Sequence, residues 1–351
     1  MSALFHTPAM RYFVVIVAAL AIVPFVPWII YPVFVMKVMC YALFACAFNL
    51  LLGYTGLVSF AHAAFLGGAG YVCGAVMVRM GQYWFGLPLA IIAGVATAAG
   101  LGLVIGGLAI RRRGIYFAMI TLALSQIVYF LALQFRWTGG EDGMQGIPRG
   151  TLFGIDLQND TAIYYFTLVL FVAGFVFVHR IIHSPFGKVL QALRDNDQRA
   201  TSLGYEVDHF KLVAFVLSAA IAGLAGVMKA LVFQLVSLND VSLHTSTEVV
   251  LMTLLGGLGT IFGPLVGAAL VVGLQNYLAT IGDLVSVVIG LVFVLCVSFF
   301  RRGLVGEFIA RRSGTVPPPA SGRTATPPPR DHHRPRRPAS PPRSERKIGR
   351  A

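Results

Sequence analysis

The stretch from Asn49 to Gly74, NLLLGYTGLVSFAHAAFLGGAGYVCG, decides the fold class of this chain. It is apolar enough to lie in a membrane, yet it is rich in glycine and carries Ser59 and His62 near its centre. Glycine costs about 1 kcal/mol relative to alanine inside a helix, and polar groups at membrane depth are expensive and usually functional. A simple anchor needs neither feature. The stretch therefore predicts a close-packed, interrupted helix pair of the kind that lines a translocation path.

The composition of the whole chain indicates a membrane protein. Of its 351 residues, 57% are hydrophobic and 12% are charged, whereas soluble domains carry about 25% charged residues. The apolar runs are long and lack the period-2 alternation of an outer-membrane barrel. We therefore predict an all-α polytopic membrane protein, a bundle of about 8–10 transmembrane helices with interrupted Gly-rich segments.

Much of the net charge of +13 lies at the C-terminal end of the sequence. Residues 313–351 hold nine Lys/Arg against Asp331 and Glu345, together with ten of the 18 prolines. Such a segment cannot bury a core, so we predict a transmembrane domain over 1–312 and a disordered Pro/Arg-rich cytoplasmic tail over 313–351. The arginines of the tail either contact membrane lipid or stay solvated. The remaining basic residues are spread over loops, which argues against a nucleic-acid partner.

Nine apolar segments approach the length of about 20 residues that a spanning helix needs. They are 12–31, 33–53, 60–79, 84–110, 115–134, 161–182, 209–233, 260–280 and 283–300. A short tenth segment, 245–257, is a half-helix, a re-entrant piece or a further crossing.

The positions of the basic residues predict the orientation of these spans. Arg111 to Arg113, the 179–211 loop and Arg301-Arg302 mark the cytoplasmic side, and the acidic 135–160 loop marks the outside. The segment after residue 233 is predicted to lie outside and Arg301 to lie inside, so the chain between them must cross the membrane an odd number of times. This parity favours a crossing by the short tenth segment.

The sequence contains no motif for catalysis or for a bound cofactor. The four cysteines lie in apolar segments without metal-ligand spacing, so we expect neither a metal nor a cofactor. No lysine is followed by Ser or Thr, so the chain has no Walker A motif and is not expected to be an enzyme. Only Glu248 and Asp283 are acids near predicted spans, which is few for an ion-coupled carrier. The energy for transport is therefore expected from a partner.

The loop at about 183–208 predicts two short amphipathic helices. Ser184 and Pro185 are a cap and a first helical residue, and apolar residues at helical spacing follow at 186, 189, 190 and 193. Asn196 or Asp197 caps the second helix, Ala200 and Leu203 form its apolar face, and Gly204 ends it. The loop either rests on lipid or docks a cytoplasmic partner, and its mixed charges favour docking.

Four blocks of sequence resemble the LivM-type permease subunits of high-affinity branched-chain amino acid ABC importers. The blocks are Asn49–Gly67, Ser184–Tyr205, Phe215–Gly226 and Gly256–Gly267, and they occur in order within about residues 33–300. The resemblance implies a pore subunit of the bacterial inner membrane that pairs with a sister permease as a heterodimer. It also implies two cytoplasmic ATP-binding subunits and a periplasmic or extracellular substrate-binding protein.

The residue patterns and the resemblance together indicate two sets of site residues. The ATPase-coupling loop contains Phe186, Gly187, Leu190, Leu193, Arg194, Asp195, Asn196, Asp197, Ala200, Leu203 and Gly204. The family's Glu-Ala-Ala consensus is replaced here by Gln198-Arg199-Ala200, which leaves the docking contacts open. The candidate translocation path contains Asn49, Gly53, Thr55, Gly56, Ser59, His62, Gly256, Gly257, Gly259, Gly263 and Pro264.

Several residues of the candidate path also have a structural interpretation. His62 is expected to hydrogen-bond to a neighbouring helix rather than to form a gate, and Ser59 to cap the helix that follows it. Pro264 between glycines predicts a break or kink. The similarity of 51–56 to 254–259 suggests an internal repeat or arises by chance in a glycine-rich chain.

Three functions other than branched-chain amino acid import remain compatible with the sequence. The same scaffold could serve urea, short amides or other amino acids. An ion-coupled secondary carrier would work without ATP. A non-transporting scaffold would use the basic tail to hold a partner.

Overall fold

The computed structural model describes residues 8–25, 31–152, 155–278, 287–288, 290–291, 293–294, 298 and 303–307. The chain divides into two units, Met1–Ser313 and Gly314–Ala351, and every described residue lies in the first. The predicted span 283–300 lies largely outside the described residues, and the predicted tail 313–351 lies wholly outside them.

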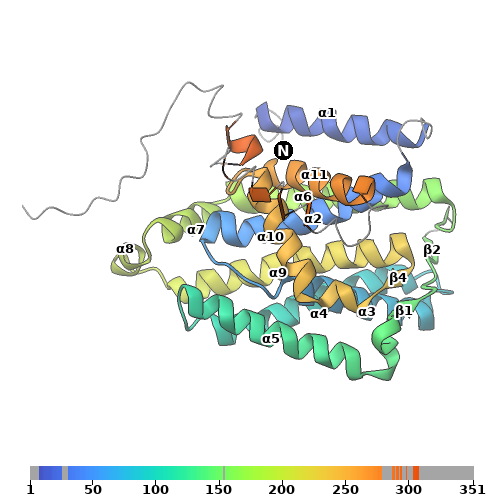
Figure 1. Ribbon diagram of the computed structural model, residues 1–351, viewed down its shortest axis with the longest axis horizontal. Coiled ribbons are helices and arrows are strands. Elements are labelled where there is room, and N and C mark those ends of the chain that lie inside the picture. The colour runs from blue at the N-terminus through green and yellow to red at the C-terminus, as the bar shows by residue number, and fades with distance from the viewer. Residues whose placement is uncertain are drawn as a thin grey trace, which may run out of the picture. The chain divides into compact units, whose positions relative to one another are not determined.

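The described residues are mostly helical, and most of the long helices run alongside one another (Figure 1). In the described part of the chain, six helices are long and apolar enough to cross a membrane: α2 (Pro32–Thr55), α3 (His62–Met80), α4 (Gly86–Ala109), α5 (Ile115–Gln134), α6 (Asp160–His183) and α9 (Val207–Phe233). They coincide with six of the predicted spans. The prediction of an all-α membrane bundle is therefore confirmed.

The other predicted spans correspond to shorter helices. The 12–31 segment contains α1 (Pro8–Ile22) and a 3-10 turn, η2 (Val23–Phe25), and residues 26–30 lie outside the described part. α10 (Leu243–Gly256) has 14 residues and α11 (Gly263–Leu278) has 16. At 1.5 Å per residue these are about 21 and 24 Å long, shorter than the hydrocarbon core of about 30 Å. The structure therefore favours the half-helix interpretation of 245–257.

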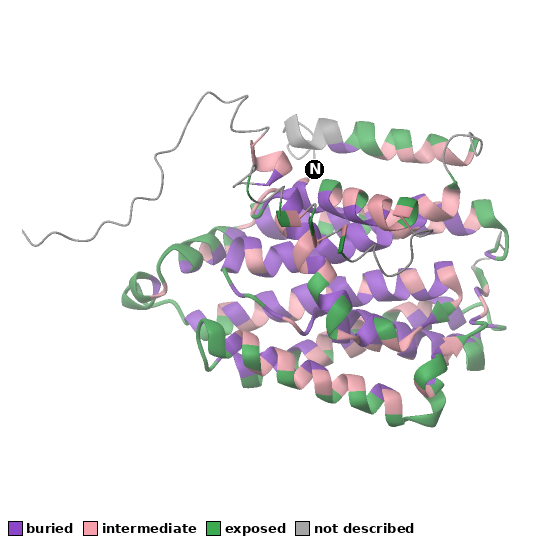
Figure 2. Ribbon diagram, viewed as in Figure 1, coloured by how far each residue is buried: buried purple, intermediate pink, exposed green. Residues whose placement is uncertain are grey.

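Burial decides which helices are central. α2 is buried over most of its length and contacts α6, α9, α10 and α11. α5 instead carries many exposed apolar side chains, as expected for a helix that faces lipid (Figure 2). α1 packs on α6, where the rings of Phe13 and Phe175 stack at 4.3 Å and the Tyr164 hydroxyl donates to the carbonyl of Leu20 at 2.6 Å.

One end of the bundle is closed by short strands. β1 (Met144–Gln145) pairs antiparallel with β4 (Leu235–Val236), and β2 (Thr151–Leu152) pairs with β3 (Ile155–Asp156). The same connection contains the 3-10 turns η3 (Arg136–Thr138) and η4 (Gly140–Asp142). We call this the strand end of the bundle. It carries the acidic loop that the charge pattern predicts to lie outside.

The opposite end carries α7 (Pro185–Asp195) and α8 (Asp197–Ser202), and we call it the loop end (Figure 1). After α9 reaches the strand end, the chain returns into the bundle through the 3-10 turn η5 (Leu238–Val241), which contacts α3. α10 then continues toward the loop end, where Gly259 lies beside Arg194 of α7. The re-entrant turn and the half-helix together thus carry the chain from the strand end to the loop end.

Candidate functional site

Two interruptions of helical structure lie inside the bundle. Break 1 is the segment 56–61 between α2 and α3, and break 2 is the segment 257–262 between α10 and α11. Each begins at a glycine with positive φ, 74° at Gly56 and 117° at Gly257, a conformation that side chains with a Cβ rarely adopt. Non-helical backbone at membrane depth is tolerated only where protein buries it or where it lines a water-filled cavity.

Break 1 returns from the loop end of α2 toward the middle of the bundle (Figure 1). α3 begins at His62, whose Nε2 lies 2.9 Å from the hydroxyl of Ser218 in α9. The same hydroxyl donates to the carbonyl of Ala47 at 2.6 Å. Ala47 lies eight residues before the end of α2 at Thr55. Eight helical residues span about 12 Å, so α3 begins well inside the bundle.

Side chains from distant helices satisfy the backbone of break 1. Thr121 of α5 accepts a hydrogen bond from the amide of Phe60 at 3.2 Å. Ser246 of α10 donates to the carbonyl of Phe60 at 2.7 Å and accepts from the amide of Ala63 at 3.1 Å. Unpaired buried backbone groups are costly, so these two hydroxyls support the non-helical conformation.

The predicted cap at Ser59 is wrong. Its hydroxyl accepts from the amide of Ala61 at 3.2 Å, within break 1, and the residue at the cap position of α3 is Ala61. The first turn of α3 instead receives its acceptor from Ser246, which comes from a helix nearly two hundred residues later. A local sequence pattern cannot reveal a cap that another helix supplies.

The prediction of a hydrogen-bonded His62 is confirmed. Ser218 uses its single proton on the Ala47 carbonyl, so it must accept from His62, and the imidazole carries its proton on Nε2. Nδ1 has no partner among the described residues. The ring is fully buried, with the rings of Phe48 and Phe65 edge-on at centroid distances of 4.9 and 5.7 Å.

Asn49 of α2 holds break 2. Its Nδ2 donates to the carbonyl of Thr260 at 2.9 Å, and its Oδ1 accepts from the amide of Gly259 at 3.0 Å. Within the break, the Thr260 hydroxyl donates to the Gly257 carbonyl at 2.8 Å. The predicted break before Pro264 is therefore present, and α11 begins beside it at Gly263.

The candidate path residues gather around the two breaks, which approach each other. A Cβ added at Gly53 would lie 2.8 Å from the amide nitrogen of Gly259, so α2 and break 2 are in backbone contact. Most of the set is buried: Asn49, Gly53, Thr55, Ser59, His62, Gly256, Gly257, Gly263 and Pro264. Gly259 is half-buried and Gly56 is exposed. A path along these residues therefore requires the breaks to move.

α7 and α8 have the predicted form. Ser184 caps α7 by accepting from the amide of Gly187 at 3.3 Å, and Asn196, not Asp197, caps α8 by accepting from Arg199 at 3.0 Å. Leu190, Leu193 and Ala200 are buried in one small cluster, with Phe186 packed at its edge and Gly187 also buried. Gly204 has φ 86° and ends the segment.

Leu203 and Asp197 lie at the two ends of α8. Leu203, predicted to share the apolar face of α8 with Ala200, is 72% exposed, whereas Ala200 is buried. α8 is only 6 residues long, and position 203 follows its end. Asp197 begins α8 and pairs with Lys211 of α9 at 2.5 Å. Arg194, Asp195 and Asn196 are exposed.

Arg194 joins α7 to the breaks. The Nη1 atom of its guanidinium donates to the carbonyl of Gly53. The same Nη1 atom also lies close to Gly259, because a Cβ atom built on that glycine would be 3.4 Å from it. A cavity of about 290 Å³ lies beside this contact at the loop end. Its charged lining is Arg112, Arg113, Arg194, Asp195, Asp197 and Lys211. The cavity is thus placed where a partner on α7 would act on α2.

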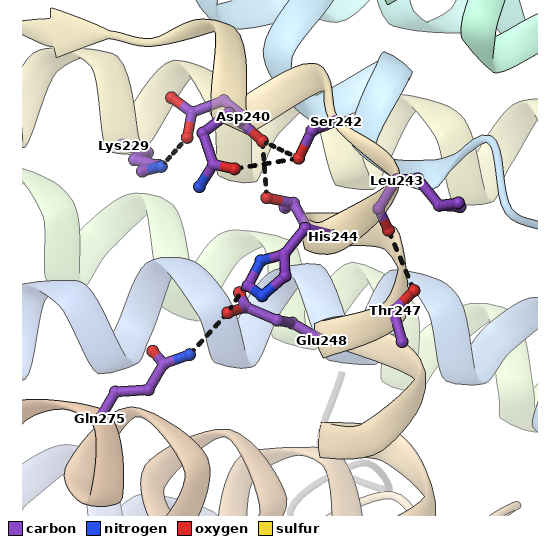
Figure 3. Close-up of polar contacts among 10 residues, drawn as sticks. Lys229, Asp240, Ser242, Leu243, His244, Thr247, Glu248 and Gln275 are labelled. Atoms are coloured by element: carbon purple, nitrogen blue, oxygen red, sulfur yellow. Dashed lines mark hydrogen bonds and ion pairs between the residues drawn. The ribbon is translucent and has the colours of Figure 1, made fainter. Parts of the chain in front are cut away.

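Sequence reasoning missed a buried pair of charges. Lys229 of α9 binds the carboxylate of Asp240 in η5 (Figure 3). The ammonium of Lys229 also lies 5.6 Å from the centre of the Tyr41 ring. The Asp240 side chain is 5% exposed and also accepts from the amide of Ser237 at 3.2 Å. Lys229 follows a long apolar run of α9, and a lysine in that position is a signal that a partner is needed, because charges inside membranes pair.

Comparison with known proteins identifies relatives for most of the chain. Residues 32–297 match the family described as branched-chain amino acid transport system / permease component. The LivM high-affinity branched-chain amino acid permease of Salmonella typhimurium is 28% identical over 297 residues, 76% of this chain and 68% of that protein. LivM of Escherichia coli is 29% identical over 294 residues, with the same coverage. The L-arabinose ABC transporter permease AraH of Azospirillum brasilense is 30% identical over 196 residues, 54% of this chain and 56% of its own. No solved structure matches the chain.

Proposed function

We infer the function from one premise: this chain belongs to the family of permease components of branched-chain amino acid transport systems. It is a multi-pass membrane protein and the permease subunit of an ABC importer, and it is not itself catalytic. Our finer proposal is that it imports branched-chain amino acids across the bacterial inner membrane, with its C-terminal tail in the cytoplasm. The similarity to LivM over three quarters of the chain supports this substrate class.

The observation that carries the proposed mechanism is the contact of Arg194 with the Gly53 carbonyl. α7 is amphipathic, and its apolar side is held on the bundle by Leu190 and Leu193. A force on its exposed side therefore reaches α2 through Arg194 and reaches break 2 through Asn49. This is a short chain of direct contacts between a surface loop and two interrupted helices.

We propose that two ATP-binding subunits dock on α7 and α8. Closure of the ATPase dimer moves α7, and the paired breaks then change conformation and open the path toward one side. Broken helices suit this task because their freed backbone groups exchange partners more easily than those inside a continuous helix. Exposed Leu203 and Tyr205, 72% and 44% accessible, offer apolar anchors for the docked subunit.

The partner at the opposite face is a substrate-binding protein that delivers the amino acid to the strand end. Glu141 and Asp142 are exposed there, beside the β1–β4 pair, and offer acceptors for a basic surface. A sister permease completes the pore. Selection is made largely by the binding protein, which explains how one scaffold serves both LivM and an arabinose permease.

The test begins with gentle purification of the chain from native membranes and identification of its companions by mass spectrometry. A second permease and one or two ATPases are expected. The reconstituted complex, with its binding protein, should then take up leucine only with ATP. A chain that purifies alone while uptake persists would overturn the ATP-driven mechanism. Uptake of arabinose, urea or a short amide in place of leucine would overturn the substrate class alone.

A further inference from the structure

Arg79, in the last turn of α3, lines two cavities at the strand end. The residue is exposed, and its guanidinium makes no hydrogen bond or ion pair with the part of the chain that the structure describes. The charge pattern predicts that this end lies outside, whereas Lys and Arg concentrate in cytoplasmic loops. An arginine that is free and out of place in this way has surroundings that indicate what it binds.

The first cavity, which we call the apolar groove, has a volume of about 470 Å³ and lies between α3 and α4. Its residues on α3 are three and four positions apart and therefore share one face of the helix. Between residues 72 and 80, α3 rises about 12 Å, close to the thickness of about 15 Å that one leaflet contributes to the hydrocarbon core. The groove thus has the length and polarity to hold part of an acyl chain. Its apolar lining includes Val72, Ala75, Val76, Met80, Leu89 and Ala93.

The second cavity, which we call the polar cavity, extends from Arg79 over the turn after α3 to the β2–β3 connection and has a volume of about 390 Å³. Its charged residues are Arg79 and Asp156. The Oδ1 atom of Asp156 accepts from the amide of Gln158 at 2.9 Å, and Oδ2 has no partner among the described residues. One cation and one anion therefore line the same polar space. This arrangement suits a head group that carries both a phosphate and an ammonium.

Exposed aromatic side chains mark the depth of Arg79 in the membrane. Tyr83 and Trp84 follow α3 in the turn to α4, and Trp137 of η3 lines the apolar groove. Tyr and Trp gather at the interface between hydrocarbon and head groups, where one end of the ring is apolar and the other is hydrated. The boundary between the apolar groove and the polar cavity therefore lies at the level where a phospholipid changes from acyl chain to head group.

We propose that the apolar groove and the polar cavity together bind one molecule of phosphatidylethanolamine. An acyl chain lies in the apolar groove, the guanidinium of Arg79 binds the phosphate, and the carboxylate of Asp156 accepts from the ammonium. Arginine suits the phosphate because its planar fork donates two hydrogen bonds at once. The lipid joins α3, α4 and the β2–β3 connection. Neither cavity is lined by a residue of the breaks or of α7, so the inference goes beyond the proposed function and does not depend on the substrate.

The two charges of the polar cavity also distinguish between phospholipids. Phosphatidylglycerol offers a phosphate to Arg79 but brings no cation to Asp156. Phosphatidylcholine carries a quaternary ammonium, which cannot donate a hydrogen bond to the carboxylate. We therefore expect the site to prefer phosphatidylethanolamine to both.

The test uses the assembled importer in nanodiscs of phosphatidylcholine with a small share of phosphatidylethanolamine that carries a diazirine in one acyl chain. Irradiation should label peptides that contain residues 72–80 and 89–93. Added unmodified phosphatidylethanolamine should suppress this labelling, and the same amount of phosphatidylglycerol should suppress it several-fold less. The exposed apolar residues of α5 report contact with bulk lipid and should label without this selectivity.

Charge-neutral variants test the two assigned contacts. Arg79→Gln and Asp156→Asn should each reduce the labelling of 72–80 about fivefold, the value of a charge-assisted contact at a hydrated surface. Arg136→Gln and Asp142→Asn are the matched controls, because both residues are exposed at the strand end and line neither cavity. Both controls should label normally.

The competition experiment uses the unaltered complex, so it decides the inference even if a variant fails to assemble. Labelling of 72–80 that phosphatidylglycerol suppresses as well as phosphatidylethanolamine does would overturn the assigned head group. Labelling there that is no stronger than on α5 would overturn the site. Cross-links from 72–80 to a second permease, without lipid labelling, would assign the groove to a subunit interface and would also overturn the inference.

Discussion

The carboxamide of Asn49 donates to the backbone carbonyl of Thr260 at 2.9 Å, across 211 positions of sequence. Its oxygen accepts from the neighbouring amide of Gly259 at 3.0 Å. One side chain of α2 therefore fixes the conformation of the break between α10 and α11. Both groups of the amide are used, and no other residue type of this size offers a donor and an acceptor in that geometry.

Replacing Asn49 with Leu should destabilise the protein by about 2–5 kcal/mol, because two buried backbone groups lose their partners. Leucine uptake should fall with it. The measurement is the thermal unfolding midpoint of the purified complex, with Asn276→Leu as an exposed control that should leave it unchanged. An unchanged midpoint in the Asn49 variant would show that break 2 does not depend on this clamp.

Replacing Gly53 with Ala should separate α2 from break 2. The added Cβ would lie 2.8 Å from the Gly259 nitrogen and would also overlap Asn49, so the backbone contact must open. We expect ATPase activity without uptake, measured together in proteoliposomes. Gly100→Ala in α4 is the control, because its Cβ would meet nothing within 4 Å and alanine favours a helix by about 1 kcal/mol. Coupled transport in Gly53→Ala would argue against paired movement of the breaks.

Ser218→Ala should cost about 1–3 kcal/mol, because His62 keeps a buried donor without an acceptor. The double variant His62→Phe/Ser218→Ala removes both polar groups, and the Phe48 and Phe65 rings already surround the site. It should be more stable than Ser218→Ala alone, and it should still transport if His62 is structural. The free energy of unfolding and uptake of the single and double variants measure this coupling. Loss of uptake in a stable double variant would instead indicate a gate.

Arg149→Met should loosen the strand end. The guanidinium donates to the carbonyls of Leu231 and Val232 at 3.3 and 2.9 Å near the end of α9, and pairs with Asp160 at 3.3 Å. We expect a loss of about 1–3 kcal/mol, and no rescue by Lys, whose single ammonium cannot reproduce the planar fork. Hydrogen exchange of residues 144–160 reports the loosening. Arg136→Met, an exposed change in the same connection, should not alter it.

Leu203→Glu should abolish coupling without loss of stability, because the side chain is 72% exposed. Leu190→Glu is the contrasting variant, since Leu190 is fully buried and a charge there should detach α7 and lower stability. Co-purification of the ATPase subunits and the unfolding midpoint separate the two effects. Normal ATPase retention by Leu203→Glu would place the docking contacts elsewhere on the loop.

The sequence by itself determined the membrane class, six spans and the two short helices α7 and α8. Long apolar runs can satisfy their backbone only as helices in lipid, and Ser184 with the spacing of Leu190 and Leu193 defines α7 locally. Such features depend on neighbours in sequence, so a pattern reveals them. The glycine-rich blocks likewise marked both breaks, because positive φ at Gly56 and Gly257 is a local requirement.

Only the tertiary structure decided which groups meet at those breaks. Ser246 caps α3, Asn49 clamps Thr260, and Lys229 pairs with Asp240 across elements that no local pattern connects. The incorrect cap at Ser59 has the same origin, since that prediction assumed that a nearby residue would supply the partner. In a bundle with interrupted helices, the freed polar groups take their partners from whichever helix packs beside them, and that choice is made by the fold as a whole.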